Sequence, residues 1–100
     1  SAYSGAKNNL LNFRNYDAGL SSFARSAQTG GDACKFTINA TAYFDGSGPY
    51  PVLSDVCYSS NNASPSNYLF AGNYRINQIG GGTANLVITG GGVVSNVYSC

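Results

Sequence analysis

Side chains suited to catalysis are scarce in this sequence, which has no histidine and no glutamate. Its side-chain carboxylates are those of Asp17, Asp32, Asp45 and Asp55. These aspartates show none of the paired spacings that place two carboxylates in one acid–base site. Serines are frequent, but none lies in a Gly-x-Ser-x-Gly motif, and no histidine is present to activate a serine or cysteine nucleophile. The sequence therefore predicts that the protein is not an enzyme.

The same absences argue against metal and cofactor sites. Three cysteines without a Cys-x-x-Cys motif, in a chain without histidine, do not match a zinc or copper site. The glycine triplets at 80–82 and 90–92 are not followed by the Lys-Ser/Thr pair of a phosphate-binding loop, and neither fits Gly-x-Gly-x-x-Gly before a helix. We therefore expect no metal ion, no nucleotide and no other cofactor.

Charge is scarce as well, because 9% of the residues are charged and the net charge is +1. A typical soluble protein has about 25% charged residues. The basic residues, at 7, 14, 25, 35 and 75, are spread along the chain, so we expect no nucleic-acid partner. No segment approaches the roughly 20 apolar residues of a membrane span. A surface with so few charges offers little electrostatic resistance to packing against other copies of the protein.

The cysteines are Cys34, Cys57 and Cys100, an odd count in a chain whose composition fits a secreted or periplasmic protein. We expect one intramolecular disulfide. Pairing of Cys34 with Cys57 is favoured, because two short neighbouring strands can bring them close, and this leaves Cys100 free. Such a loop of about two dozen residues is worth about 3 kcal/mol in the chain-entropy model. The competing pairing joins Cys57 to Cys100, and the sequence does not decide between them.

The first 28 residues have the periodicity of an amphipathic helix. On a helical wheel, the apolar residues fall within one arc of about 140°, opposite a polar face. The stop signal Thr29-Gly30-Gly31-Asp32 follows, since glycine can adopt the left-handed cap conformation. The expected core face of this helix consists of Leu10, Phe13, Tyr16, Leu20, Phe23 and Ala27.

The rest of the chain alternates between short strands and turns rich in glycine. The expected strands lie at 36–44, 52–58, 68–76, 84–89 and 93–98, and the expected exposed loops at 45–51 and 59–67. The two glycine triplets bound the fourth of these strands and predict a meander of the last three. We therefore predict an α+β fold, in which one long N-terminal amphipathic helix packs on an antiparallel sheet of four or five strands. Residues 1–100 are expected to form a single domain, with the helix at 1–28 and the sheet at 35–98.

The segment Ser1-Ala2-Tyr3-Ser4-Gly5-Ala6-Lys7-Asn8-Asn9-Leu10-Leu11-Asn12-Phe13 resembles the stretch of bacterial type IV pilins that leaves the membrane. The family's cleavage-site glycine, methylated aromatic residue and apolar half-helix are not present. The resemblance implies a structural subunit of a type IV pilus, or of a related pseudopilin filament, at the cell surface. It would assemble with other copies by helix packing and touch the membrane only through a missing N-terminal segment. Its loops at 45–51 and 59–67 would contact a host or abiotic surface.

Two other classes of secreted protein remain open from the sequence. A small fungal or yeast killer toxin or host-directed effector, cleaved ahead of Ser1, would explain the absence of methionine and the low charge. A carbohydrate-binding module is a third possibility, because eight tyrosines and clusters of asparagine suit a sugar-binding face. A segment of about 25 apolar residues directly ahead of Ser1 in the precursor would indicate a pilin. A dibasic site after a pro-region would indicate a toxin.

Overall fold

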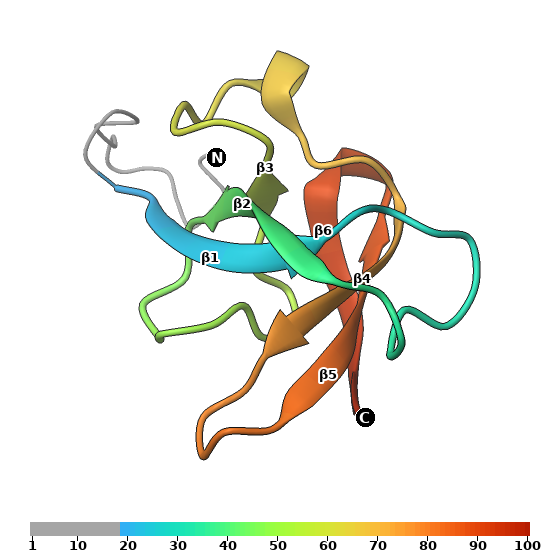
Figure 1. Cartoon of the computed structure of the whole chain (residues 1–100). Coiled ribbons are helices and arrows are strands. Elements are labelled where there is room, and N and C mark those ends of the chain that lie inside the picture. Colours follow the sequence, from blue (N-terminus) through green and yellow to red (C-terminus); the bar gives the residue numbers. More distant parts are fainter. Residues whose placement is uncertain (1–18) are drawn as a thin grey trace.

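The computed structural model describes residues 19–100, which form a strongly curved antiparallel sheet of six strands (Figure 1). The order of strands across the sheet is β3-β2-β1-β4-β5-β6, so the first strand of the chain lies at its centre. The strands are β1 Ser21–Ser26, β2 Ile38–Phe44, β3 Cys57–Tyr58, β4 Gly72–Asn77, β5 Thr83–Thr89 and β6 Val93–Ser99. Two short 3-10 turns, η1 Pro65–Asn67 and η2 Gly90–Gly92, complete the regular structure of this part of the chain.

The predicted α+β fold with a helix over 1–28 is wrong, because residues 21–26 form the central strand β1. Strand β1 pairs with β2 along its whole length, with Phe23 opposite Ala42, and with β4 at Arg25. Backbone pairing with neighbours on both sides outweighs the local helical periodicity of these residues. The strand SSFARS buries Phe23 and Ser26, whereas Ser21 and Ser22 are exposed.

The described residues of the expected helix face differ in burial. Leu10, Phe13 and Tyr16 lie outside the described residues. Leu20 is half-buried just ahead of β1, Phe23 is buried within it, and Ala27 is exposed beyond its end. Phe23 is thus the one described member of that face that reaches the core, where it meets the Phe44 ring edge-to-face with centroids 5.6 Å apart.

The other strands follow the sequence pattern more closely. The alternation at 36–44 becomes β2, and the segments at 84–89 and 93–98 become β5 and β6. The predicted meander of the last three strands is confirmed, since β4 pairs with β5 and β5 pairs with β6, both antiparallel. Two expected strands are shorter than predicted: 52–58 is reduced to β3, and 68–76 begins as a strand only at Gly72.

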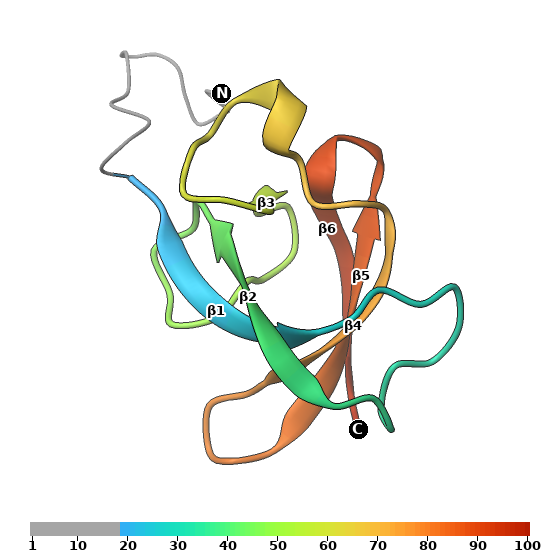
Figure 2. The same ribbon diagram turned by 45° about the horizontal axis from the view of Figure 1, so that its top comes forward.

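The sheet curls until its two edges meet at one end, and Figure 2 shows its strands curving around a common interior. Val56, just ahead of β3, forms a bridge with Val93 at the start of β6. Two backbone hydrogen bonds join the same segments, from Ser54 N to Val94 O and from Val94 N to Asp55 O, both 2.9 Å. The interior is filled by a cluster of buried side chains: Phe23, Ala42, Phe44, Cys57, Leu69, Tyr74, Ile76, Ala84, Leu86, Ile88 and Val94.

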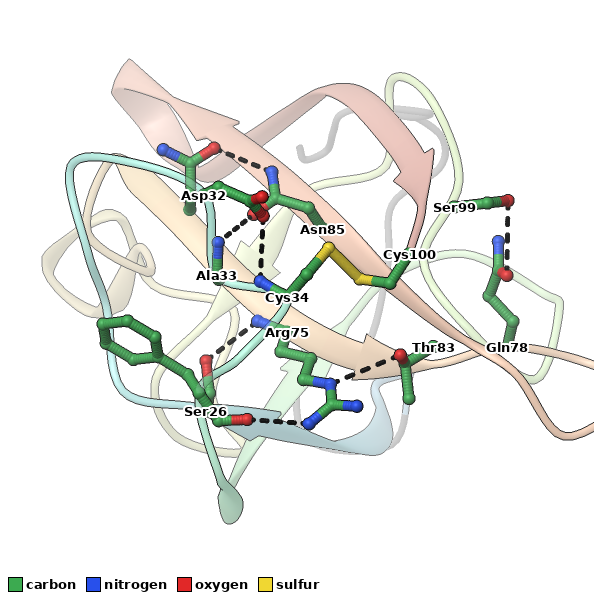
Figure 3. Close-up of a disulfide and its surroundings, with 12 residues drawn as sticks. Ser26, Asp32, Ala33, Cys34, Arg75, Gln78, Thr83, Asn85, Ser99 and Cys100 are labelled. Carbon is green, nitrogen blue, oxygen red and sulfur yellow. Dashed lines mark hydrogen bonds between the residues drawn. A yellow bond between two sulfur atoms is a disulfide. The ribbon is translucent and has the colours of Figure 1, made fainter.

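One disulfide is present, as expected, and it joins Cys34 to Cys100 with a Cα–Cα distance of 5.6 Å (Figure 3). The favoured Cys34–Cys57 pairing and the alternative Cys57–Cys100 pairing are both wrong. Cys57 lies opposite Phe44 at the far end of β2, whereas Cys34 lies ahead of the start of β2 at Ile38. The two ends of that strand are about 20 Å apart at the rise of a β-strand. Cys57 is instead a buried free thiol.

The disulfide fastens the long β1–β2 connection to the last strand, and hydrogen bonds support it on both sides. Asp32 Oδ1 accepts from Cys34 N at 2.9 Å, and Cys100 N donates to Thr83 O at 2.9 Å. Beside the disulfide, the buried amide of Asn85 accepts from Ala33 N at 2.7 Å, as Figure 3 shows. The connection is therefore held against β5 and β6 by covalent and polar contacts together.

Candidate binding groove

A concave site lies among the loop at 48–53, the end of β4 and β6, away from the contact between Val56 and Val93. The loop at 48–53 forms one wall, the end of β4 with the following turn forms the other, and β6 lies beside them. The cavity has a volume of about 640 Å³. This size lies within the usual range for a ligand site. Its lining residues are Gly48, Pro49, Tyr50, Pro51, Val52, Leu53, Ile76, Asn77, Gln78, Ile79, Asn96 and Val97, which we call the groove.

Two aspartates hold the loop wall of the groove in place. Asp45 Oδ1 accepts from Val56 N at 2.9 Å, and Asp55 Oδ2 accepts from Val52 N at 3.0 Å. The Asp55 side chain also lies so close to Gly46 that a Cβ at this position would collide with it. Both carboxylates therefore act as turn-forming acceptors. Asp45 begins the expected exposed loop at 45–51, whereas Asp55 lies in the expected strand at 52–58, which forms only at Cys57–Tyr58.

The opposite wall is a tight turn between β4 and β5. Gln78 N donates to Gly82 O at 2.9 Å, and Gly81 N donates to Gln78 O at 3.2 Å. Gly80 and Gly81 have φ values of 92° and 96°, which glycine adopts without a steric cost. This geometry projects Ile79 into solvent, where 78% of its surface is exposed.

The surface around the groove is apolar and uncharged. Val52 and Leu53 are each 59% exposed on the loop wall and face the groove together with Ile79. The polar lining side chains are the amides of Asn77, Gln78 and Asn96 and the hydroxyl of Tyr50, and no lining residue carries a charge. Such a surface suits an uncharged, largely apolar ligand, and it offers no group that transfers a proton at neutral pH.

The described acidic residues accept hydrogen bonds from backbone N–H groups. Asp32 caps the Cys34 turn, and Asp45 and Asp55 organise the loop at 45–55. Within residues 19–100 no three His, Cys, Asp or Glu side chains gather as metal ligands would. None of the helices in the same part of the chain has the length and apolar character needed to cross a bilayer.

Among the cysteine candidates, Cys34 and Cys100 form the disulfide, and Cys57 lies apart from it and from the groove lining. Burial raises the pKa of the Cys57 thiol far above its ordinary value, and the nearby Asp55 and Asp45 charges raise it further. This cysteine therefore stays protonated and is a poor nucleophile at neutral pH.

Sequence reasoning placed the loop at 45–51 on the surface but did not identify the groove. The sequence pattern predicts a strand for Val52 and Leu53, although Pro49 and Pro51 just ahead of them restrict strand pairing. The sequence pattern assigns Ile79 neither to a strand nor to a site. An isolated large aliphatic residue next to a glycine triplet was the available signal.

Comparison of the chain with protein-family models, with curated proteins and with solved structures gives no match.

Proposed function

We propose that the protein is a small secreted binding protein of the effector or toxin type, without catalytic activity. Its groove holds an extended apolar segment of a partner protein. The observation that carries this proposal is the concentration of exposed Val52, Leu53 and Ile79 around a concave, uncharged site. Exposed aliphatic side chains gathered at one site are typical of a surface that another molecule covers.

The edge of β6 supports an extended peptide as the occupant. Within residues 19–100, the outer edge of β6 is joined to the segment ahead of β3 at Val93 and Val94, and no strand pairs with this edge further along. Asn96 and Val97 of this free portion line the groove. A peptide that adds to an open strand edge gains backbone hydrogen bonds, while its alternate side chains enter the adjacent pocket.

The disulfide supports the secreted location. Bonds such as Cys34–Cys100 persist in oxidising compartments and are rare in the cytosol. The low charge of the chain is consistent with a partner recognised through apolar and backbone contacts.

Assembly into a type IV pilus or pseudopilus stays a prediction from the first 13 residues. That assembly requires a continuous helix over 1–28 to pack against neighbouring subunits, and residues 21–26 form the central strand of this domain. The described residues therefore favour a binding role through the groove.

The proposal is tested by selecting peptides from a random display library on the full chain and measuring the best synthetic peptide by calorimetry. We expect peptides rich in uncharged apolar residues. Leu53→Asp and Ile79→Asp each remove a contact worth about 1 to 2 kcal/mol, which is about a tenfold loss of affinity. Both side chains are mostly exposed in the free protein, so the fold tolerates the change. The matched control is Phe70→Asp, which alters an equally exposed apolar residue outside the groove.

Equal affinity of the wild type and Ile79→Asp for the selected peptide would exclude the groove as the binding site. Sedimentation provides a second criterion. A wild-type dimer that becomes a monomer in Ile79→Asp would show that a second copy of the chain occupies the groove, contrary to the proposal.

A further inference from the structure

A second hollow lies away from the groove, between β1, the start of β4 and the segment ahead of β4. Its volume is about 320 Å³, and its lining includes Arg25, Ser59, Ser66, Tyr68, Phe70 and Tyr74. This volume lies at the lower end of the range for small-molecule sites. Unlike the groove, this hollow contains a cation and three aromatic side chains.

The guanidinium group of Arg25 is held here without a negatively charged partner among residues 19–100. Its Nη1 donates to the neighbouring Ser26 carbonyl at 3.1 Å, and its central carbon lies 5.5 Å from the centroid of the Tyr74 ring. Its Nε is buried and has no hydrogen-bond acceptor. A guanidinium group keeps its charge in proteins, and enclosing an N–H without an acceptor costs free energy. Because Nε is enclosed, an anion in the hollow would meet the terminal nitrogens of this guanidinium, which no carboxylate of residues 19–100 neutralises.

Contacts within the domain hold Tyr74 and Tyr68 at the hollow. The Tyr74 hydroxyl donates to Phe70 O at 2.7 Å, and burial raises the pKa of this hydroxyl, so it remains a donor at neutral pH. Tyr68 stacks on Tyr58 with ring centroids 5.6 Å apart. Phe70 is 80% exposed, although its backbone is held by Tyr74. An exposed ring on a fixed backbone offers a flat apolar face beside the cation.

Hydroxyl groups complete the rim of the hollow. Ser59 Oγ donates to Asn67 O at 3.2 Å, and Ser66 Oγ shares a hydrogen bond of 2.9 Å with Ser64 Oγ. A hydroxyl has two acceptor lone pairs as well as a donor, so both groups retain capacity for a further hydrogen bond. The hollow thus combines a cation, a flat apolar face and neutral polar groups.

We propose that this hollow binds a uronic acid residue of an acidic polysaccharide. The ligand carboxylate accepts hydrogen bonds from Arg25, the sugar ring stacks on Phe70 and Tyr68, and the sugar hydroxyls meet Ser59 and Ser66. A charge-assisted pair between arginine and carboxylate gives the specificity, because no residue of the described part of the chain supplies a counter-charge to this guanidinium. The site is independent of the groove, so either can fail without the other.

The test measures binding of a short oligogalacturonate to the full chain by calorimetry and by chemical-shift perturbation. We expect a dissociation constant in the micromolar to millimolar range and shifts at Phe70 and Tyr68. Methyl esterification of the same oligosaccharide removes the charge but keeps the ring, and it should weaken binding at least tenfold. Arg25→Gln should have a similar effect. Its matched control is Lys35→Gln, which removes the same charge from an exposed position outside the hollow.

Since Arg25 lies in the central strand, Arg25→Gln can also lower stability. Phe70→Ser is the second variant, because its side chain is exposed, and it should weaken binding several-fold without unfolding the protein. Equal binding of the methyl ester, or unchanged affinity of Phe70→Ser, would overturn the proposal. Absence of binding to the oligogalacturonate would do the same. A peptide with a C-terminal phenylalanine is the comparison arm, and binding of this peptide alone would assign the hollow to peptide carboxylates instead.

Discussion

Removal of the disulfide should bring the protein close to the limit of stability. The bridged residues are 66 apart in the sequence, so the covalent loop contains all of β2 to β6. In the chain-entropy model, a loop of this length removes enough freedom from the unfolded chain to stabilise the native state by about 4 kcal/mol at 25 °C. Proteins of this size unfold with about 5 to 15 kcal/mol in total, so the loss is a large fraction of the stability.

The perturbation is the double substitution Cys34→Ser and Cys100→Ser, which leaves no unpaired thiol at either position. Unfolding in urea is followed by circular dichroism and by tyrosine fluorescence, since the chain has eight tyrosines and no tryptophan. The free energy of unfolding should fall by about 4 kcal/mol, and the urea concentration at the transition midpoint should fall accordingly. The slope should rise, because the unbridged unfolded chain exposes more surface.

Wild type in excess dithiothreitol is the control and should unfold at the same midpoint as the double variant. Asn85 continues to bind Ala33 N after the bridge is lost, so the β1–β2 connection keeps one anchor. A double variant within about 1 kcal/mol of the oxidised wild type would refute the reasoning, because the bridge would then restrict the unfolded chain very little.

Three further predictions concern the closed end of the sheet. Cys57 should resist iodoacetamide in the folded protein, with no increase in rate from pH 7 to 9, and should react as one thiol per chain in urea without reductant. Because folding raises the pKa of this thiol, its contribution to the free energy of unfolding is fully present at neutral pH. The contribution should decline above about pH 9, where the unfolded chain loses the thiol proton first. Urea titration at a series of pH values measures this decline. Gly92→Ala should lower the thermal midpoint strongly, because φ is +73° there and a Cβ would collide with Cys57 O. Gly90→Ala, which meets nothing within 4 Å, is its control, and equal midpoints for the two variants would contradict the packing at Gly92.

The strands that were predictable from sequence are those whose signal is local. In β2, apolar residues alternate with polar ones up to the buried Phe44, and β5 and β6 are separated by glycines of which Gly91 and Gly92 have positive φ. Strand pairing in such a meander depends mostly on neighbouring segments and their turn. The period of two and the glycine triplets therefore sufficed to predict these elements.

The position of β1 was not predictable in the same way. Its central place depends on two partners, β2 and β4, and the pairing with β4 brings Arg25 opposite Ile76, far along the chain. The spacing of Leu20, Phe23 and Ala27 fits a helix face, yet Ser21 and Ser22 separate Leu20 from Phe23 with small polar residues. Serine is a poor helix former, so these two residues weaken the helical prediction for this segment. A local pattern does not show which distant strand will pair with it.

The groove and the disulfide share this dependence on distant segments. Val52 and Ile79 meet the same cavity from a loop and from a turn that no spacing rule connects. The pairing of Cys34 with Cys100 likewise requires the position of the β1–β2 connection over β5, where Asn85 binds Ala33. In each case the sequence indicates the chemistry of the side chains, but it does not indicate which distant segments lie together.

The burial of Cys57 also affects how the chain reaches its oxidised state. Three cysteines permit three single bridges, and in two of them Cys57 would have to leave the interior beside Phe44 and Leu69. Once the sheet has closed over this thiol, oxidants reach Cys34 and Cys100 alone among the three. Folding before oxidation therefore restricts the disulfide to the pair Cys34 and Cys100. A chain whose Cys57 is accessible to a thiol reagent is therefore unfolded or carries a bridge other than Cys34–Cys100.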